Sequence, residues 1–158
     1  MQLSELISSP DSVIANLKAT GKKQVLQELA HKAGRLMRMS DRVVFETLLE
    51  RERLGSTGVG QGIAIPHGKL PGIDRLYGVF ARLETPVDFE AIDGQPVDLI
   101  FLLLAPENAG ADHLKALARI SRLMRNGAMV ERLRGCDDQA ALYALLSDPM
   151  DNVSPHAA

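Results

Sequence analysis

Apolar residues in the first third of the chain return every three or four positions, which is the period of amphipathic helices. A first helix is expected behind Thr20, which can act as its N-cap. A second helix is expected from Asp41 to about Leu54, with Ser40 as its cap and Gly55 as a natural C-terminal stop. The inward residues expected in these two helices are Val25, Leu26, Leu29, Ala33, Leu36, Met37, Val44, Phe45, Leu48 and Leu49.

Short, continuous apolar runs predict strands instead of helices. The predicted strands are Val13 to Leu17, Ile63 to Ile65, Leu76 to Leu83 and Val97 to Leu104. The pair Asp93-Gly94 is a turn signal between the last two of them. The longest run, LIFLLLA from Leu99 to Ala105, is far too short to span a bilayer and is typical of a buried strand.

Helical periodicity returns towards the C-terminus. One helix is expected from about Ala111 to Arg125, a short one around Met129 to Leu133, and a last one from about Gln139 to Leu146. Asp137 or Asp138 can cap the last helix. The inward residues expected in the first of these helices are Leu114, Leu117, Ile120 and Leu123.

Strands and helices are interspersed without a strict repeating rhythm, so the expected fold is α/β. It should contain a mixed four- to five-stranded sheet flanked by helices on both faces. Residues 1–147 are expected to form a single domain, since this length suffices for an independent core. The polar, proline-containing residues 148–158 are expected to form a flexible C-terminal tail.

The charge balance argues against two classes of partner. The chain has 18 Lys and Arg against 20 Asp and Glu, a formal charge of -2, which offers no general attraction to nucleic acid or anionic lipid. Its single cysteine, Cys136, cannot form an internal disulfide and fits a reducing compartment. The N-terminal residues lack the pattern of a signal peptide. We therefore expect a cytoplasmic protein with no nucleic-acid partner and no membrane insertion.

The most informative segment is RERLGSTGVGQGIAIPHGK, from Arg51 to Lys69. Its glycines permit positive φ angles and can expose N–H groups to an anion. A P-loop requires GxxxxGK followed by Ser or Thr, and a dinucleotide fingerprint requires GxGxxG between a strand and a helix. The spacing here is GxGxG, and the loop leads from a helix into a strand. The segment does not predict a nucleotide site.

His67 follows this loop at the end of a strand-like run. Pro66 fixes its own φ and stops the strand ladder, and Gly68 leaves little bulk beside the imidazole. An unperturbed imidazole has a pKa of about 6.5, so much of it is neutral at neutral pH and offers a nucleophilic lone pair. A structural role for this histidine and a role in phosphoryl transfer are both open at this point.

Three further residues are candidates for the same site. His113 lies in the first turn of the helix that begins near Ala111, where the helix dipole favours an anion. It can help to hold a phosphoryl group, or it can simply face solvent. Arg51 and Arg53 end the second helix, where cations are common, yet either guanidinium offers a fork that matches phosphate oxygens.

A metal site built from His67, His113 and Asp112 is the weakest alternative. No pair among them has the tight spacing usual for zinc ligands. We expect no metal and no cofactor.

The string LGSTGVGQGIAIPHGK closely resembles the site region of enzyme IIA proteins of the fructose/mannitol class in the bacterial phosphotransferase system. The likeness continues through ETPVDFEAIDGQPVDLIFLLLAP and ADHLKALARIS, and covers the chain from about Leu3 to Leu146. The strings LLERERLGSTG and HGKL look most like the nitrogen-regulatory branch of that class.

The resemblance implies that His67 is the phosphorylated residue, that His113 is its neighbouring histidine and that Arg51 contacts the phosphoryl group. It implies an HPr-like phosphocarrier as donor. For the nitrogen-regulatory branch it implies an output through regulated target proteins, such as potassium transport or sensor kinases. The alternative is a sugar-specific IIA that passes phosphate to a separate IIB protein. An output by docking suits an apolar surface, to which Leu70 and Phe89 are candidate contributors, although core packing suits Phe89 better.

Overall fold

The computed structural model describes residues 2–147, so the expected tail at 148–158 lies outside the described residues. The strands are β1 (Val13–Leu17), β2 (Gly58–Gly60), β3 (Ile63–Ala64), β4 (His67–Leu70), β5 (Tyr77–Val87) and β6 (Val97–Pro106). The helices are α1 (Lys22–Met37), α2 (Asp41–Leu54), α3 (Ala111–Met124), α4 (Gly127–Arg134) and α5 (Gln139–Ser147), with 3-10 turns at Leu3–Glu5 and Pro10–Ser12. None of the helices within residues 2–147 is both long and apolar enough to cross a membrane.

The strands form one mixed sheet in the order β1-β5-β6-β3-β2, and β4 also pairs with β6. β5 and β6 are antiparallel, whereas β1 runs parallel to β5 and both β3 and β4 run parallel to β6. This confirms the predicted α/β class. The sheet has six strands instead of the expected four to five, because the short segments β2 and β4 also pair.

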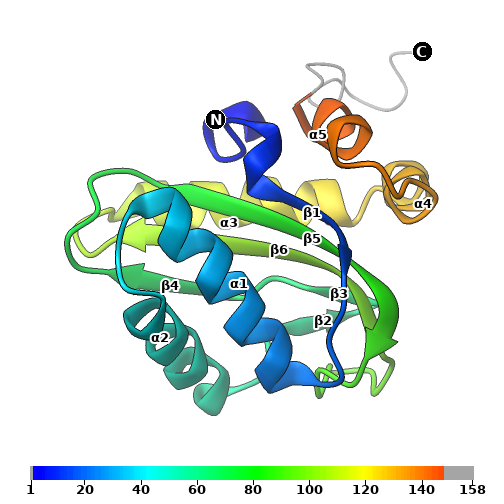
Figure 1. The fold of residues 1–158 in the computed structure, drawn as a ribbon, viewed down its shortest axis with the longest axis horizontal. Coiled ribbons are helices and arrows are strands. Elements are labelled where there is room, and N and C mark those ends of the chain that lie inside the picture. Colours follow the sequence, from blue (N-terminus) through cyan, green and yellow to red (C-terminus); the bar gives the residue numbers. More distant parts are fainter. Residues whose placement is uncertain (1, 148–158) are drawn as a thin grey trace.

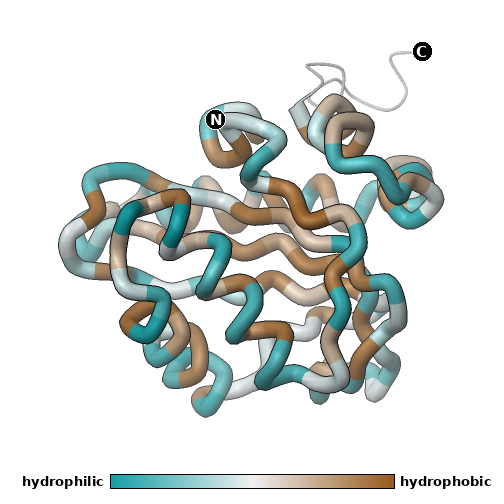
Figure 2. Tube along the Cα trace, in the orientation of Figure 1, coloured by the Kyte–Doolittle hydropathy of each residue, from teal (hydrophilic) through white to brown (hydrophobic). Residues whose placement is uncertain are grey.

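β6 lies in the middle of the sheet and is buried on both faces. Ile100, Leu102 and Leu104 pack towards α1 and α2. The alternate residues Leu99, Phe101 and Leu103 pack towards α3, α4 and α5. This alternation follows from the two-residue period of a strand and explains why the run LIFLLLA is apolar throughout. Figure 1 shows α1 and α2 on one side of the sheet, and Figure 2 shows the apolar positions concentrated along the central strands.

Pairing with β6 places His67. Ile63 and Ala64 of β3 pair with the first half of β6, and His67 of β4 pairs with Leu103 further along the same strand. The expectation that Pro66 ends the ladder is therefore wrong: the proline interrupts it, and pairing resumes at His67. The carbonyl of Pro66 still accepts a hydrogen bond from Leu103 N at 2.9 Å, so the interruption stays attached to β6.

The helix caps differ in part from those expected. Gly21, not Thr20, is the N-cap of α1, while Thr20 donates from N and Oγ1 to Oε1 of Gln24. Ser40 occupies the N-cap position of α2 but its side chain makes no capping hydrogen bond. Asp138 supports the start of α5, where its Oδ2 accepts from Ala141 N at 2.8 Å.

The buried stripe of α3 is displaced from the predicted one. Leu114 is 67% exposed, whereas His113 is 9% and Ala116 0% exposed. Residues 113, 116, 120 and 123 keep the helical spacing, so the stripe begins with a histidine that hydropathy alone assigns to solvent. Leu70 is also fully buried, and it is therefore not part of an exposed docking surface.

Candidate functional site

His67 begins β4 and is only partly buried, and both of its ring nitrogens have partners. Its Nδ1 lies 2.9 Å from the carbonyl oxygen of Ile65. A carbonyl can only accept, so Nδ1 carries the proton and donates it. Nε2 accepts from Nε of Arg51 at 3.3 Å. The two contacts together define a neutral imidazole whose lone pair is on Nε2.

Arg51 lies in the last turn of α2 and is held from two sides. Its Nη1 donates to the carbonyl oxygen of Gly55 at 2.9 Å while its Nε faces His67. Arg53 is exposed and approaches Glu50 at 3.5 Å. Of the two candidate arginines, the structure therefore brings Arg51 to His67, whereas Arg53 pairs with Glu50.

His113 lies beside His67, with ring centroids 5.7 Å apart and ring planes inclined by 52°. The first-turn histidine is therefore buried and does not face solvent. Burial lowers its pKa below the ordinary 6.5, and the positive charges of His67, when protonated, and of Lys69 lower it further. Its Nδ1 is buried and has no hydrogen-bond partner within residues 2–147. The site thus contains a second imidazole that stays neutral at neutral pH.

Gly68 is required by its neighbour on α2. A Cβ on Gly68 would lie 2.8 Å from Cγ2 of Thr47, so a side chain at this position would force α2 or β4 to shift. The absence of a side chain therefore lets α2 approach β4, which brings Arg51 to His67. The sequence predicted that Gly68 leaves open space beside the imidazole of His67. In the structure, the space beside Gly68 is filled by the side chain of Thr47.

Three N–H groups of the glycine-rich loop already have acceptors within the protein. Thr57 N donates to Glu52 Oε1 at 3.0 Å, and Gly58 N donates to Ser56 Oγ at 3.0 Å. Gln61 N donates to Asp93 Oδ2 at 2.9 Å, a contact that lowers the pKa of Asp93. The loop is held internally at these three positions, so these three N–H groups are not available to an anion.

Sequence reasoning missed a buried charged group beside Arg51. Glu52 is 8% exposed, although it lies in a helix turn rich in charged residues. It contacts Lys22 of α1 at 2.9 Å and both the backbone N and the hydroxyl of Thr57. The only signal for it in the sequence is its place on the same helical face as the buried Leu48, four residues earlier.

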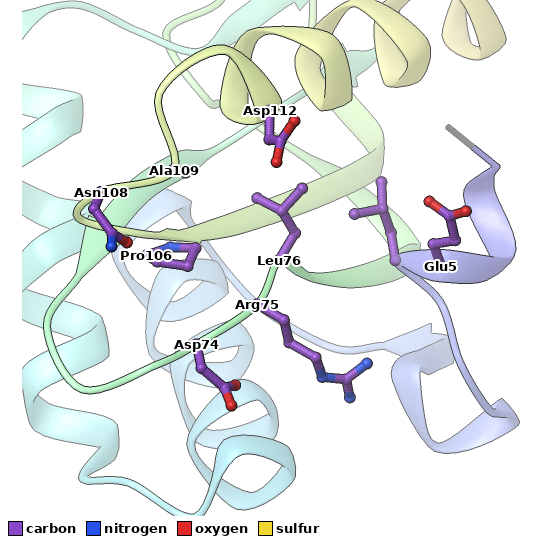
Figure 3. Close-up of a pocket in the computed structure, with 9 residues that line it drawn as sticks. Glu5, Asp74, Arg75, Leu76, Pro106, Asn108, Ala109 and Asp112 are labelled. Carbon is purple, nitrogen blue, oxygen red and sulfur yellow. The ribbon is translucent and has the colours of Figure 1, made fainter.

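Other parts of the surface do not contribute to this site. A pocket of about 380 Å³ lies near the start of α3 and includes Asp112, but neither His67 nor His113 lines it. Figure 3 shows its mixed lining, with acidic side chains and Arg75 around Leu76. Within residues 2–147 no group of three or more His, Cys, Asp or Glu side chains could hold a metal ion, so the proposed triad with Asp112 is not assembled.

The arrangement suits a reaction with an anionic, electrophilic group. Nε2 of His67 has an oriented lone pair, and the guanidinium of Arg51 lies against it. The neutral imidazole of His113 lies beside the His67 ring. The N-terminus of α3 adds the positive end of a helix dipole near His113. Phosphoryl transfer needs alignment and charge stabilisation of this kind.

Comparisons with known proteins also indicate a phosphotransferase component. The family profile described as "Phosphoenolpyruvate-dependent sugar phosphotransferase system, EIIA 2" matches residues 6–148. A nitrogen regulatory protein of Bradyrhizobium diazoefficiens is 56% identical over 94% of this chain and 97% of its own length. The crystal structure of nitrogen regulatory protein IIA-Ntr from Neisseria meningitidis superposes with a TM-score of 0.84 at 37% identity, over 91% of this chain and 97% of that one.

A sugar-specific relative is also found. The fructose-specific EIIABC component of Bacillus subtilis is 32% identical over 93% of this chain, which corresponds to 23% of that longer protein. The predicted resemblance, including its nitrogen-regulatory branch, is confirmed by the family match and by the relatives of that name. The chain belongs to the EIIA type 2 family of the phosphoenolpyruvate-dependent phosphotransferase system.

Proposed function

We propose that Nε2 of His67 accepts a phosphoryl group from an HPr-like phosphocarrier and that the phosphorylated protein acts as a nitrogen-related regulator. The observation that carries this is the pair of contacts on one ring. Nδ1–H of His67 donates to the Ile65 carbonyl oxygen, and Nε2, which holds the lone pair, accepts from Arg51. A histidine with a merely structural role has no need of one fixed tautomer at a partly exposed strand end.

In the transfer step, Nε2 of His67 attacks the phosphorus carried by the donor histidine. The new N–P bond forms as the donor's N–P bond breaks, and the bonding electrons return to the donor nitrogen. The proton of His67 stays on Nδ1 during the attack, hydrogen-bonded to the Ile65 carbonyl oxygen. The product ring is therefore positively charged at first, which offsets the charge of the incoming group.

Arg51 and His113 have separate roles in this proposal. The Arg51 guanidinium moves from Nε2 to the phosphoryl oxygens as the donor arrives, while Gly55 retains its Nη1. His113 stays neutral because its pKa is lowered, so it can donate one N–H to a phosphoryl oxygen without adding charge in the resting site.

The surface beside the site supports a protein as the donor. Leu54 ends the helix that carries Arg51 and is 85% exposed, and Leu114 follows His113 and is 67% exposed. Apolar side chains in such positions are typical of protein interfaces. We place the donor over these two residues, with its phosphorylated histidine directed at His67.

The output of the protein is a change of binding partners. A phosphoryl group adds about -1.5 to -2 charges to this surface, which can repel one target and recruit another. Regulated targets of the potassium-transport or sensor-kinase kind, in the cytoplasm, fit the nitrogen-regulatory relatives. The second candidate is a sugar-specific IIA that passes phosphate to a separate IIB protein, favoured by the similarity to a fructose-specific EIIABC component.

Incubation with phosphoenolpyruvate, enzyme I and an HPr-type carrier tests the first step. The intact protein should gain the mass of one phosphoryl group, and the label should be lost in acid. His67→Ala should abolish the gain, whereas His31→Ala, on the exposed face of α1, should retain it. Normal labelling of His67→Ala would contradict the assignment. Onward transfer to a fructose-type IIB at a rate similar to that of a dedicated sugar IIA would favour the second candidate.

A further inference from the structure

We infer that Glu52 is a positioning residue that fixes both ring nitrogens of His67, and that Lys22 and Thr57 act with it. Neither glutamate nor lysine touches the imidazole. Their effect on transfer rests on the proposed function, but their effect on the imidazole tautomer does not.

Glu52 is an unusually buried charge for a surface helix. Its side chain is 3% exposed, and that of Lys22, at 2.9 Å, is 15% exposed. Removing two charges from water is costly unless their geometry and hydrogen bonds are good. Glu52 meets this condition because its two carboxylate oxygens also accept from the backbone N and the hydroxyl of Thr57.

The first connection to His67 runs through Thr57. This residue is 3% exposed and is bound to the Glu52 carboxylate twice. Its carbonyl oxygen accepts from Ile65 N at 3.0 Å. The carbonyl oxygen of the same Ile65 accepts a hydrogen bond from Nδ1–H of His67. The carboxylate therefore helps to hold Ile65, the residue whose carbonyl oxygen selects the tautomer.

The second connection runs through the end of α2. The carbonyl oxygen of Glu52 accepts from Gly55 N at 3.1 Å, and the carbonyl oxygen of Gly55 accepts from Nη1 of Arg51 at 2.9 Å. Arg51 then donates from Nε to Nε2 of His67. Glu52 therefore supports both hydrogen bonds of the His67 ring. Its side chain acts through Thr57 and Ile65, and its backbone carbonyl acts through Gly55 and Arg51.

Lys22 connects this network to a second helix. It lies in the first turn of α1, and its Nζ also approaches Glu90 at 3.4 Å and stands 5.0 Å from the centre of the Phe89 ring. The ammonium neutralises the buried carboxylate and attaches the end of α2 to the loop before β6. Without it, the carboxylate would be left buried with the Thr57 donors alone.

Thr57→Val and Thr57→Ser form the most direct test. Valine keeps the shape but removes the hydroxyl, whereas serine keeps the hydroxyl. The position of the imidazole proton is read from the ¹⁵N chemical shifts of the His67 ring. In the wild type and in Thr57→Ser, the proton should be on Nδ1. In Thr57→Val, a mixture of the two tautomers should appear, and phosphoryl acceptance should slow by about tenfold.

Glu52→Gln is the second variant, with Glu50→Gln as its matched control on the exposed face of the same helix. The amide offers one acceptor oxygen and turns a donor towards Lys22 or Thr57, so Glu52→Gln should show the same tautomer mixture. Glu50→Gln should behave as the wild type. If Glu52→Gln does not fold, Thr57→Val still decides the matter, because its volume is unchanged.

Unchanged ring shifts and unchanged transfer in a folded Thr57→Val would overturn the inference. A tautomer mixture in that variant, together with a wild type that takes up no phosphate at all, would support the positioning role and contradict the proposed function instead. A slower transfer with an unchanged tautomer would also count against Glu52 acting through the Ile65 peptide.

Discussion

The Nε of Arg51 stands 3.3 Å from Nε2 of His67, on the lone pair that the imidazole would use as a nucleophile. In the resting protein the guanidinium therefore occupies the place where a phosphoryl group would stand. This contact favours a mechanism in which Arg51 changes its hydrogen-bond partner. Its guanidinium leaves Nε2 of His67 and binds the oxygens of the arriving phosphoryl group. Its second contact, to the Gly55 carbonyl, keeps it close during the exchange.

Replacing the guanidinium by an ammonium should therefore slow phosphoryl acceptance. Arg51→Lys retains the charge but loses the planar fork and the Nε donor, and we expect a decrease of about tenfold or more in the rate. Rapid-quench labelling with the phosphorylated carrier measures it. Arg53→Lys is the control, since Arg53 is exposed and lies against Glu50. Equal rates for both variants would remove Arg51 from the mechanism.

The lowered pKa of His113 predicts a pH-dependent stability. In the unfolded chain this histidine takes up a proton near its ordinary pKa of 6.5, whereas in the folded protein it does so only at lower pH. The unfolded state therefore binds more protons in this window, and the free energy of unfolding should fall as the pH drops below about 6.5. Above that pH the contribution is fully present.

Urea unfolding of the wild type and of His113→Gln between pH 5 and pH 7.5 checks this. The difference in stability between the two proteins should change across the window, because glutamine does not titrate. Parallel curves throughout the range would show that His113 is not buried as a neutral imidazole.

The close approach of α2 to β4 can be tested at Gly68. Gly68→Ala places a Cβ 2.8 Å from Cγ2 of Thr47 and should cost about 1–3 kcal/mol of stability. In a Thr47→Ser background that methyl is gone while the hydroxyl that donates to Val43 remains, so the alanine should cost much less. Thermal or urea unfolding of the four proteins measures the coupling. An equal cost in both backgrounds would exclude this contact as the reason for the glycine.

Docking of the donor at the surface beside the site can be tested at Leu114. Leu114→Asp should raise the donor concentration needed for half-maximal transfer, with little change in stability, because the side chain is exposed. Ile92→Asp is the control, because Ile92 is an equally apolar side chain that is 79% exposed. It lies in the loop before β6, where its backbone N donates to the carbonyl oxygen of Gly58. A similar loss for the two variants would indicate a general charge effect.

The elements that depend on local pattern could be predicted from the sequence. The run in β6, the two amphipathic helices α1 and α2, and the Gly55 stop follow from spacing and composition. The continuation of pairing at His67 could not be predicted, because Pro66 removes a donor and signals an end to the ladder. Only tertiary pairing with β6 restores it.

The site was predictable as a set of residues and not as a geometry. The family resemblance implied His67, Arg51 and His113 as the site residues, and the structure brings the three together. The burial of His113 was not predictable, since hydropathy places a histidine in solvent and Leu114 inside. The burial of Glu52 depends on Lys22, which is thirty positions earlier in the chain and becomes a neighbour only when α1 packs on α2.

The most direct measurement is the location of the phosphoryl group within the phosphorylated protein, by ¹⁵N and ³¹P NMR of the histidine rings at neutral to alkaline pH. A tautomer held by the Ile65 carbonyl predicts a phosphorus bonded to Nε2 of His67, with the Nδ1 environment still directed at Ile65. Phosphorus on Nδ1 of His67, or on His113, would contradict that chemistry.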